Sequence, residues 1–138
     1  MLDMIQIVLA GIAAISLVVG GIGIMNTMYT AVLERRKEIG IMKAVGARNS
    51  DIFKLFFIES GFLGSAGGLI GIALGFGFAK LVQIIALQGF DITLRATFNP
   101  LLMTSALLFS FFVGSISGVM PAMQASRLKP IESLRSQK

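Results

Sequence analysis

The sequence predicts an all-α, polytopic membrane protein with three transmembrane helices and a further helix between the first and the second. Only 14% of its 138 residues are charged, against roughly 25% in soluble domains. Three uncharged runs, residues 4–33, 60–79 and 96–126, each reach the ~20 residues that a helix needs to cross the hydrocarbon core. Three buried helices of a soluble domain are the alternative, but they require more polar surface than this composition offers.

The first predicted span, residues 4–33, leads into a charged segment, residues 34–54, that is rich in helix-forming residues. We expect its helix to continue directly from the span and to end near Val45, with Gly46 as the C′ residue. Three apolar residues recur in it at helical spacing: Ile39, Met42 and Val45. A solvated loop would explain the Arg and Lys of this segment but not its apolar side.

The second predicted span, residues 55–79, belongs to a helix that Ser50 should cap and that should run to about Leu87. Overlapping GxxxG spacings, which allow close helix contacts in lipid, link its glycines and predict a packing face made of Gly64, Gly68, Gly71 and Gly75. The pattern leaves open whether this face packs within one protomer or across the two-fold axis of a dimer.

The third predicted span, residues 100–121, opens with Asn99 as N-cap and Pro100 at the first helical position. A second face of small residues follows: Ser110, Gly114 and Gly118. Pro121 is placed to bend or end this helix. The connection 80–99 contains a strand-like alternation, DITLRATF, and the tail 122–138 is polar and basic.

The distribution of Lys and Arg predicts the orientation in the membrane. Six of the twelve lie in residues 34–54 and four in the tail 122–138, so the positive-inside rule places both segments in the cytoplasm. The N-terminus and the connection 80–99 then lie outside. Because no signal peptide precedes an outside start, we expect the chain to be the C-terminal piece of a longer protein.

The residues expected of an enzyme are missing from this sequence. It has no cysteine and no histidine, which removes thiolate sites and the commonest general base. No phosphate-binding GxxxxGK[ST] pattern and no carboxylate pair within an apolar run occur. We therefore predict no catalytic, cofactor or metal residues, and no nucleic-acid partner, because the basic charge follows topology. Glu59 lies inside an apolar run, where snorkelling or pairing with a basic neighbour is favoured over an ion site.

Three segments together resemble a known family. GGIGIMNTMYTAVLERRKEIGIMKAVGA (20–47), IESGFLGSAGGLIGIALG (58–75) and PAMQASRLKPIESLR (121–135) resemble, in this order, the FtsX-like permease domain of MacB-type ABC transporters. Such permeases normally have four transmembrane helices and a large extracytoplasmic domain between the first two. The resemblance therefore implies that this chain is the last three helices, without the first helix and the outer domain.

The resemblance also implies a role for the charged segment, which in such permeases docks on an ATPase subunit or domain. Carried over, this coupling site comprises Glu34, Arg35, Glu38, Ile39, Gly40, Met42, Lys43 and Gly46. The expected function is transmission of ATPase-driven motion across the cell membrane, for export or extracytoplasmic substrate handling. The chain itself would bind no cofactor, and ATP would act through the partner ATPase. A second permease copy and an extracytoplasmic adaptor are further implied partners. The alternative is a small oligomeric channel or scaffold without an ATPase.

Overall fold

Five α-helices dominate the described chain. The structure, a computed structural model, describes residues 2–90 and 99–128. Its helices are α1 (Leu2–Glu34), α2 (Arg36–Ala44), α3 (Asn49–Phe90), α4 (Pro100–Ser117) and α5 (Val119–Arg127). No strand occurs within these two ranges, which confirms the predicted all-α class. The strand-like pattern DITLRATF falls on residues 91–98 and lies outside the described residues.

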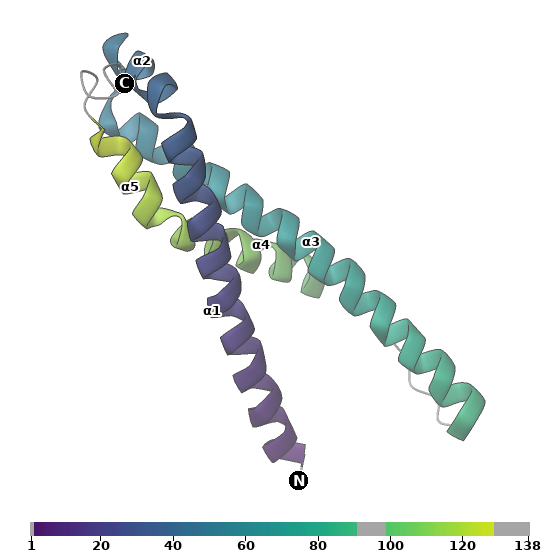
Figure 1. The fold of residues 1–138 in the computed structure, drawn as a ribbon. Coiled ribbons are helices and arrows are strands. Elements are labelled where there is room, and N and C mark those ends of the chain that lie inside the picture. The colour runs from purple at the N-terminus through teal and green to yellow at the C-terminus, as the bar shows by residue number, and fades with distance from the viewer. Residues whose placement is uncertain (1, 91–98, 129–138) are drawn as a thin grey trace.

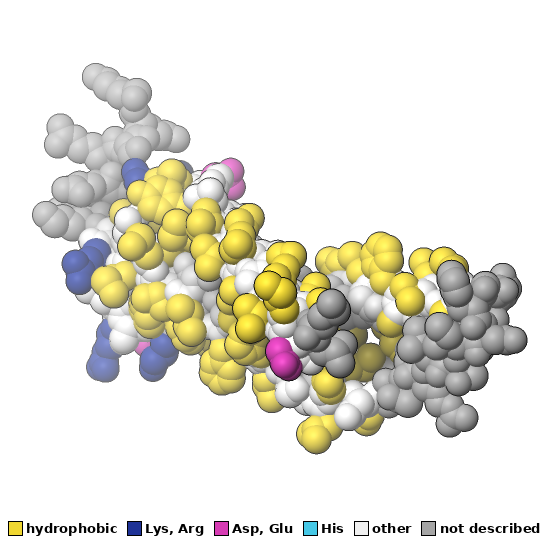
Figure 2. All heavy atoms as spheres, turned by 90° about the horizontal axis from the view of Figure 1, so that it is seen from below, with side chains coloured by type: hydrophobic (Ala, Val, Ile, Leu, Met, Phe, Trp, Pro, Cys, Tyr) yellow, Lys and Arg dark blue, Asp and Glu magenta, His cyan; other side chains and the backbone are white. Residues whose placement is uncertain are grey.

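Three of these helices are long and apolar enough to cross a membrane, as the sequence predicts. The candidate spans are Asp3–Glu34 with 32 residues, Asn49–Ala86 with 38 and Pro100–Ser117 with 18. Large apolar side chains cover much of the face displayed in Figure 2, while Lys and Arg gather at one end of it. So much exposed apolar surface is expected of a protein surrounded by hydrocarbon.

The helices are arranged as a V that is closed at one end. Helices α1 and α3 meet at the end where α2 and α5 lie, and they diverge toward the other end (Figure 1). Helix α4 packs along α3, and α5 packs on both α3 and α1. Residues 3–20 of α1 are exposed throughout. The packed core of the described chain therefore sits at the closed end of the V.

Helix α2 does not continue directly from α1, which corrects the expectation of one unbroken helix. The chain turns at Arg35, whose φ of −96° and ψ of 14° lie in the sparsely populated bridge region. The Arg35 amide still donates to the Ala31 carbonyl at 3.0 Å, and the Ile39 amide donates to the Arg35 carbonyl at 3.0 Å. Every residue around this turn is a good helix former, so the break has a tertiary cause.

The end of α2 follows the predicted glycine stop. Gly46 has a φ of 110°, a conformation that favours glycine because it carries no Cβ. The Gly46 amide donates to the Lys43 carbonyl at 3.1 Å, and the Ala47 amide donates to the Met42 carbonyl at 3.0 Å. These two bonds form a Schellman motif, which ends α2 and reverses the chain toward α3.

The start of α3 differs from the expected Ser50 cap. The helix begins at Asn49, and the amides of Asp51 and Ile52 both donate to the Arg48 carbonyl. The Asp51 carboxylate accepts from the Arg48 amide at 3.2 Å, which is the returning half of a capping box. Arg48 therefore occupies the cap position, and Ser50 lies within the first turn.

The third span starts where the sequence predicts, and Pro121 explains where α4 ends. The Asn99 side chain accepts from the Leu101 amide at 3.1 Å and from the Leu102 amide at 3.4 Å, and Pro100 follows it. Helix α4 stops at Ser117, and α5 begins at Val119. Pro121 has no N–H for the Ser117 carbonyl and its ring crowds that carbonyl, so the bend that the sequence predicted falls one turn before the proline.

The two small-residue faces partly pack against each other within one protomer. A Cβ added to Gly64 would lie 2.8 Å from the Cα of Gly114, and one added to Gly68 would lie 2.6 Å from the Ser110 Oγ. Gly118 faces Ser60 in the same way. By contrast, nothing lies within 4 Å of a Cβ added to Gly71 or Gly75. The predicted glycine face is therefore split into an internal half and an open half.

Candidate functional site

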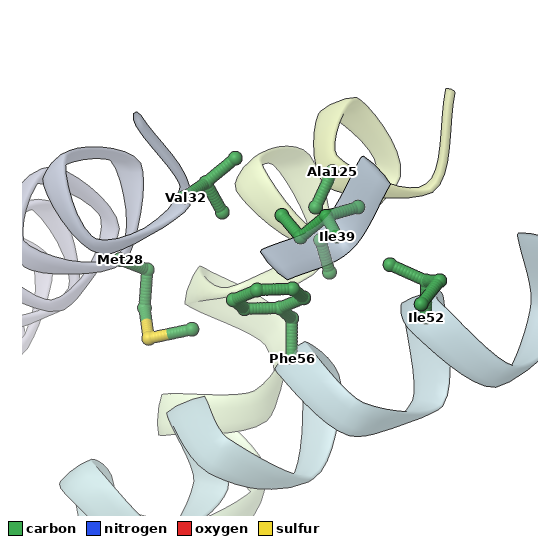
Figure 3. Close-up of a cluster of buried hydrophobic side chains, with 7 residues drawn as sticks. Met28, Val32, Ile39, Ile52, Phe56 and Ala125 are labelled. Atoms are coloured by element: carbon green, nitrogen blue, oxygen red, sulfur yellow. The ribbon is translucent and has the colours of Figure 1, made fainter. Parts of the chain in front are cut away.

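The closed end of the V is built around α2. Ile39 is fully buried and points into a cluster that four helices share (Figure 3). The buried members of this cluster are Met28, Val32, Ile39, Ile52, Phe56, Ala122 and Ala125. They come from α1, α2, α3 and α5, so a nine-residue helix that is too short to be stable alone is held by tertiary packing. The turn at Arg35 lets Ile39 reach this cluster.

Lys43 connects α2 to the end of α5. Its Nζ donates to the Ser126 carbonyl at 2.6 Å and to the Leu128 carbonyl at 2.7 Å. Ser126 lies in the last turn of α5 and Leu128 is its C-cap; at this end of a helix, carbonyls lack partners within the helix and a cation is favoured by the helix dipole. Partial burial lowers the pKa of Lys43 below its usual 10.5. Lys43 is thus an internal contact between segments 83 residues apart.

Arg35 connects the turn between α1 and α2 to α3. Its guanidinium lies 3.2 Å from the Glu59 carboxylate and 3.8 Å from that of Glu38. Of the two explanations that the sequence favoured for Glu59, snorkelling or pairing with a basic residue, the structure shows pairing, and the partner is Arg35. Both side chains are more than a third exposed, so the pair is worth about 1 kcal/mol or less. The ion pair orients the side chains of Arg35 and Glu59 but contributes little to the stability of the fold.

The predicted coupling residues fall into two groups in the structure. Four of them face the protein interior or its edge: Ile39, Gly40, Met42 and Lys43. Four others are exposed: Glu34, Arg35, Glu38 and Gly46. The expectation that the apolar stripe of Ile39 and Met42 faces a partner needs correction, because Ile39 is in the core and Met42 packs against it.

The exposed side of α2 carries its own apolar residues. Val45 is 85% exposed and Ile41 is 47% exposed. Ile41 and Val45 lie four and eight residues after Lys37, which places all three on one side of the helix. We call this surface the outer face of α2; it comprises Lys37, Glu38, Ile41, Ala44 and Val45, all exposed. Of the predicted apolar stripe, only Val45 lies on it.

Sequence reasoning missed α5 and the shared cluster. A signal for the cluster exists in the helical spacing of its members, since Met28 and Val32 are four residues apart, as are Ile52 and Phe56. In membrane spans that are apolar all round, however, this spacing does not distinguish a packed side chain from a lipid-facing one.

Comparison with known proteins decides the family. A family model described as the C-terminal region of FtsX-like permeases matches residues 10–130. The chain belongs to the FtsX-like permease family. The three candidate spans and the short helix α2 are therefore those of an FtsX-like permease, and the resemblance seen in the sequence is confirmed.

Similar proteins of this family are permeases of ABC transporters. An uncharacterised ABC transporter permease of Methanocaldococcus jannaschii is 46% identical over 136 residues, which are 99% of this chain and 34% of that protein. The macrolide export ATP-binding/permease protein MacB of Bdellovibrio bacteriovorus is 47% identical over 131 residues, 95% of this chain and 19% of that protein. MacB of Burkholderia cenocepacia is 45% identical over 130 residues. This FtsX-like permease chain thus spans 19–34% of the length of the first two of these relatives.

Within residues 2–90 and 99–128, the permease chain shows no group of three or more Asp, Glu, His or Cys side chains that could hold a metal ion. Its grooves are apolar instead. One of about 760 Å³ lies between α1 and the α4–α5 bend, lined by Met25, Met120 and Met123 among others. Another of about 580 Å³ lies where α1 and α3 diverge, and it includes Gly20, Gly67 and Gly71. The geometry of these grooves supports close packing of helices.

Proposed function

We propose that this chain is the membrane part of an ABC transporter permease that receives the motion of a partner ATPase on the outer face of α2. The observation that carries the proposal is the position of α2 itself. Its inner side, through Ile39, joins a cluster that α1, α3 and α5 share. Its outer face remains exposed and offers Ile41 and Val45. A push on α2 is therefore delivered to all three helices at once.

The composition of the outer face fits a soluble protein partner. An amphipathic helix that lies in a groove of another protein uses apolar anchors rimmed by charge. Ile41 and Val45 are such anchors, and Lys37 and Glu38 lie beside them. ATP would be bound by that partner and not by this chain. The names of the relatives that combine ATP-binding and permease parts support an ABC-type ATPase as this partner.

The substitution Val45→Asp tests this docking surface. Because Val45 is 85% exposed, the permease should fold and insert normally, whereas a charge buried against the ATPase without a partner is costly. We expect at least a tenfold loss of ATPase co-purification at matched permease levels, corresponding to about 1.4 kcal/mol or more. A charge at Met42 is no clean test, because Met42 packs against the chain's own core.

Lys37→Ala is the control, because Lys37 is an exposed cation of the same face. Its removal should change capture by less than about fivefold, since exposed charge pairs are worth about 1 kcal/mol or less. The captured protein is identified as the ATPase by its phosphate-binding motif and by ATP hydrolysis. If Val45→Asp captures this ATPase as well as the parent does, the outer face is not the docking surface.

We also propose that the permease works as a dimer in the cell membrane, with its N-terminus outside and α2 and α5 in the cytoplasm. The concentration of Lys and Arg in residues 34–54 and in the tail supports this orientation. The open Gly71 and Gly75 positions offer close approach to a helix of the second copy. An extracytoplasmic adaptor would then act on the far side, where α1 and α3 diverge.

A further inference from the structure

Helix α2 is bounded by two changes of chain direction. On one side lies the turn at Arg35, and on the other the Schellman motif at Gly46. The backbone hydrogen bonds at the two joins restrict the orientation of this nine-residue helix. Contacts that α2 makes with other helices add to this restriction and determine which side becomes the outer face.

Two kinds of contact are available for this purpose. Ile39 fills a place in the shared cluster and Met42 packs against it, but apolar contacts are less directional than hydrogen bonds. Lys43 lies four residues further along the helix and donates to two carbonyls of α5 at 2.6 and 2.7 Å. Both distances are short for N–H···O bonds and typical of charge-assisted ones. Because hydrogen bonds are directional, this contact restrains the rotation of α2 more than the apolar cluster does.

The geometry points to Lys43 as a positioning residue that locks α2 to the C-terminal turn of α5, so that the outer face and α5 move as one body. This inference deepens the proposed function and rests on it for the meaning of the outer face. The family resemblance placed Lys43 among the residues that contact the ATPase. In the structure, its Nζ instead donates hydrogen bonds to the carbonyls of Ser126 and Leu128. Its contribution to docking is therefore indirect.

The lock changes the route by which displacement leaves α2. Through the backbone, motion would pass across the turn at Arg35 into α1 and across the Gly46 turn into α3. With Lys43 in place, it also passes directly into the end of α5, which packs on α3 as well as on α1. Both arms of the V then receive the displacement through α5 as well as through the backbone and the shared cluster.

Hydrogen exchange of the full-length permease in lipid nanodiscs tests the lock without any ATPase. Lys43→Met keeps the aliphatic stem and removes the donors, so backbone amides of α2 and of the last turn of α5 should exchange at least fivefold faster. Amides of α4 should be unchanged. Lys37→Met, the same substitution at an exposed site of α2, should leave all of them unchanged. Lys43→Arg, which retains charge and several donors, should restore most of the protection.

A distance measurement then tests whether α2 and α5 move together. Because the chain has no cysteine, spin labels can be placed at Arg36→Cys and Gln124→Cys, both exposed, in the permease–ATPase complex. The distance between them should stay constant between the nucleotide-free and the ATP-trapped complex, and should broaden or shift by several ångströms in Lys43→Met.

Each outcome bears on one proposal. If Lys43→Met matches the parent in exchange and in label distance, the lock is refuted. If Lys43→Met lowers the yield of folded permease, Lys43→Gln replaces it in the exchange experiment, because glutamine keeps a shorter, neutral donor. Its exchange rates should lie between those of the parent and of a variant without the donor. Exchange rates equal to those of the parent would refute the lock. If Val45→Asp leaves ATPase capture intact, the docking proposal fails, while the exchange comparison still decides the role of Lys43.

Discussion

Arg35 and Lys43 show how neighbouring cations of one basic segment have different surroundings. Arg36 and Lys37 are exposed and fit the positive-inside pattern. Arg35 pairs with Glu59 on α3, and Lys43 donates to the end of α5. In the sequence all four are equivalent helix-forming cations. Burial and hydrogen-bond partners separate them, and both depend on helices that are distant along the chain.

Gly64 and Gly71 should differ sharply on substitution by leucine. A side chain at Gly64 meets the backbone of Gly114 at 2.8 Å and that of Ser110, so Gly64→Leu must separate α3 from α4. We expect a loss of about 1–3 kcal/mol or more from overpacking, measured as a lower thermal unfolding temperature in detergent. Normal stability of this variant would contradict the contact between α3 and α4.

Gly71→Leu is the matched variant, because nothing lies within 4 Å of its added Cβ. The stability of the protomer should remain unchanged. If the open half of the glycine face contacts a second copy, the same variant should shift the oligomer toward the monomer on size-exclusion chromatography. An unshifted elution would place the dimer contact elsewhere on the molecule.

At the scale of elements, α2 is defined by its two ends more than by its helix propensity. The Schellman motif at Gly46 ends it, and the turn at Arg35 begins it. Between them, Ile39 anchors the helix in the core. The orientation of the outer face follows from these three points together with the Lys43 contact on the end of α5, so an altered end should disturb docking without any change on the outer face.

Gly46→Ala should destabilise the end of α2 through the backbone alone. An added Cβ meets nothing within 4 Å, but the φ of 110° is strained for alanine. We expect a cost of about 1–2 kcal/mol, detected as faster hydrogen exchange in residues 43–48 and weaker ATPase capture. Gly20→Ala is the control, because its Cβ also meets nothing and no positive φ is involved. Equal behaviour of the two variants would exclude a role for the strained turn.

At the scale of the whole molecule, the charge pattern predicts which end of the V faces the cytoplasm. Single cysteines at Lys37 and at Gln88 allow a direct test in a chain that has none. A membrane-impermeant maleimide added to intact cells or right-side-out vesicles should label position 88 and should label position 37 only after permeabilisation. Labelling of position 37 in sealed vesicles would reverse the proposed topology and exclude docking of a cytoplasmic ATPase on α2.

The sequence by itself determined the class, the three spans and several helix ends. Apolar runs longer than ~20 residues impose membrane helices, and local backbone chemistry places Asn99–Pro100 at a helix start and Gly46 at a helix end. These features depend on residues within a few positions of each other. The family was visible for a similar reason, since the segments that carry it are contiguous.

Only the tertiary structure decided which of two equally apolar sides of α2 faces inward. Ile39 and Val45 look alike in the sequence, yet one is fully buried and the other is 85% exposed. It likewise divided the glycine face into a half that packs on α4 and a half that stays open. The physical reason is that close packing depends on the position of a partner helix, and in a chain where most residues are apolar, composition does not distinguish protein contact from lipid contact.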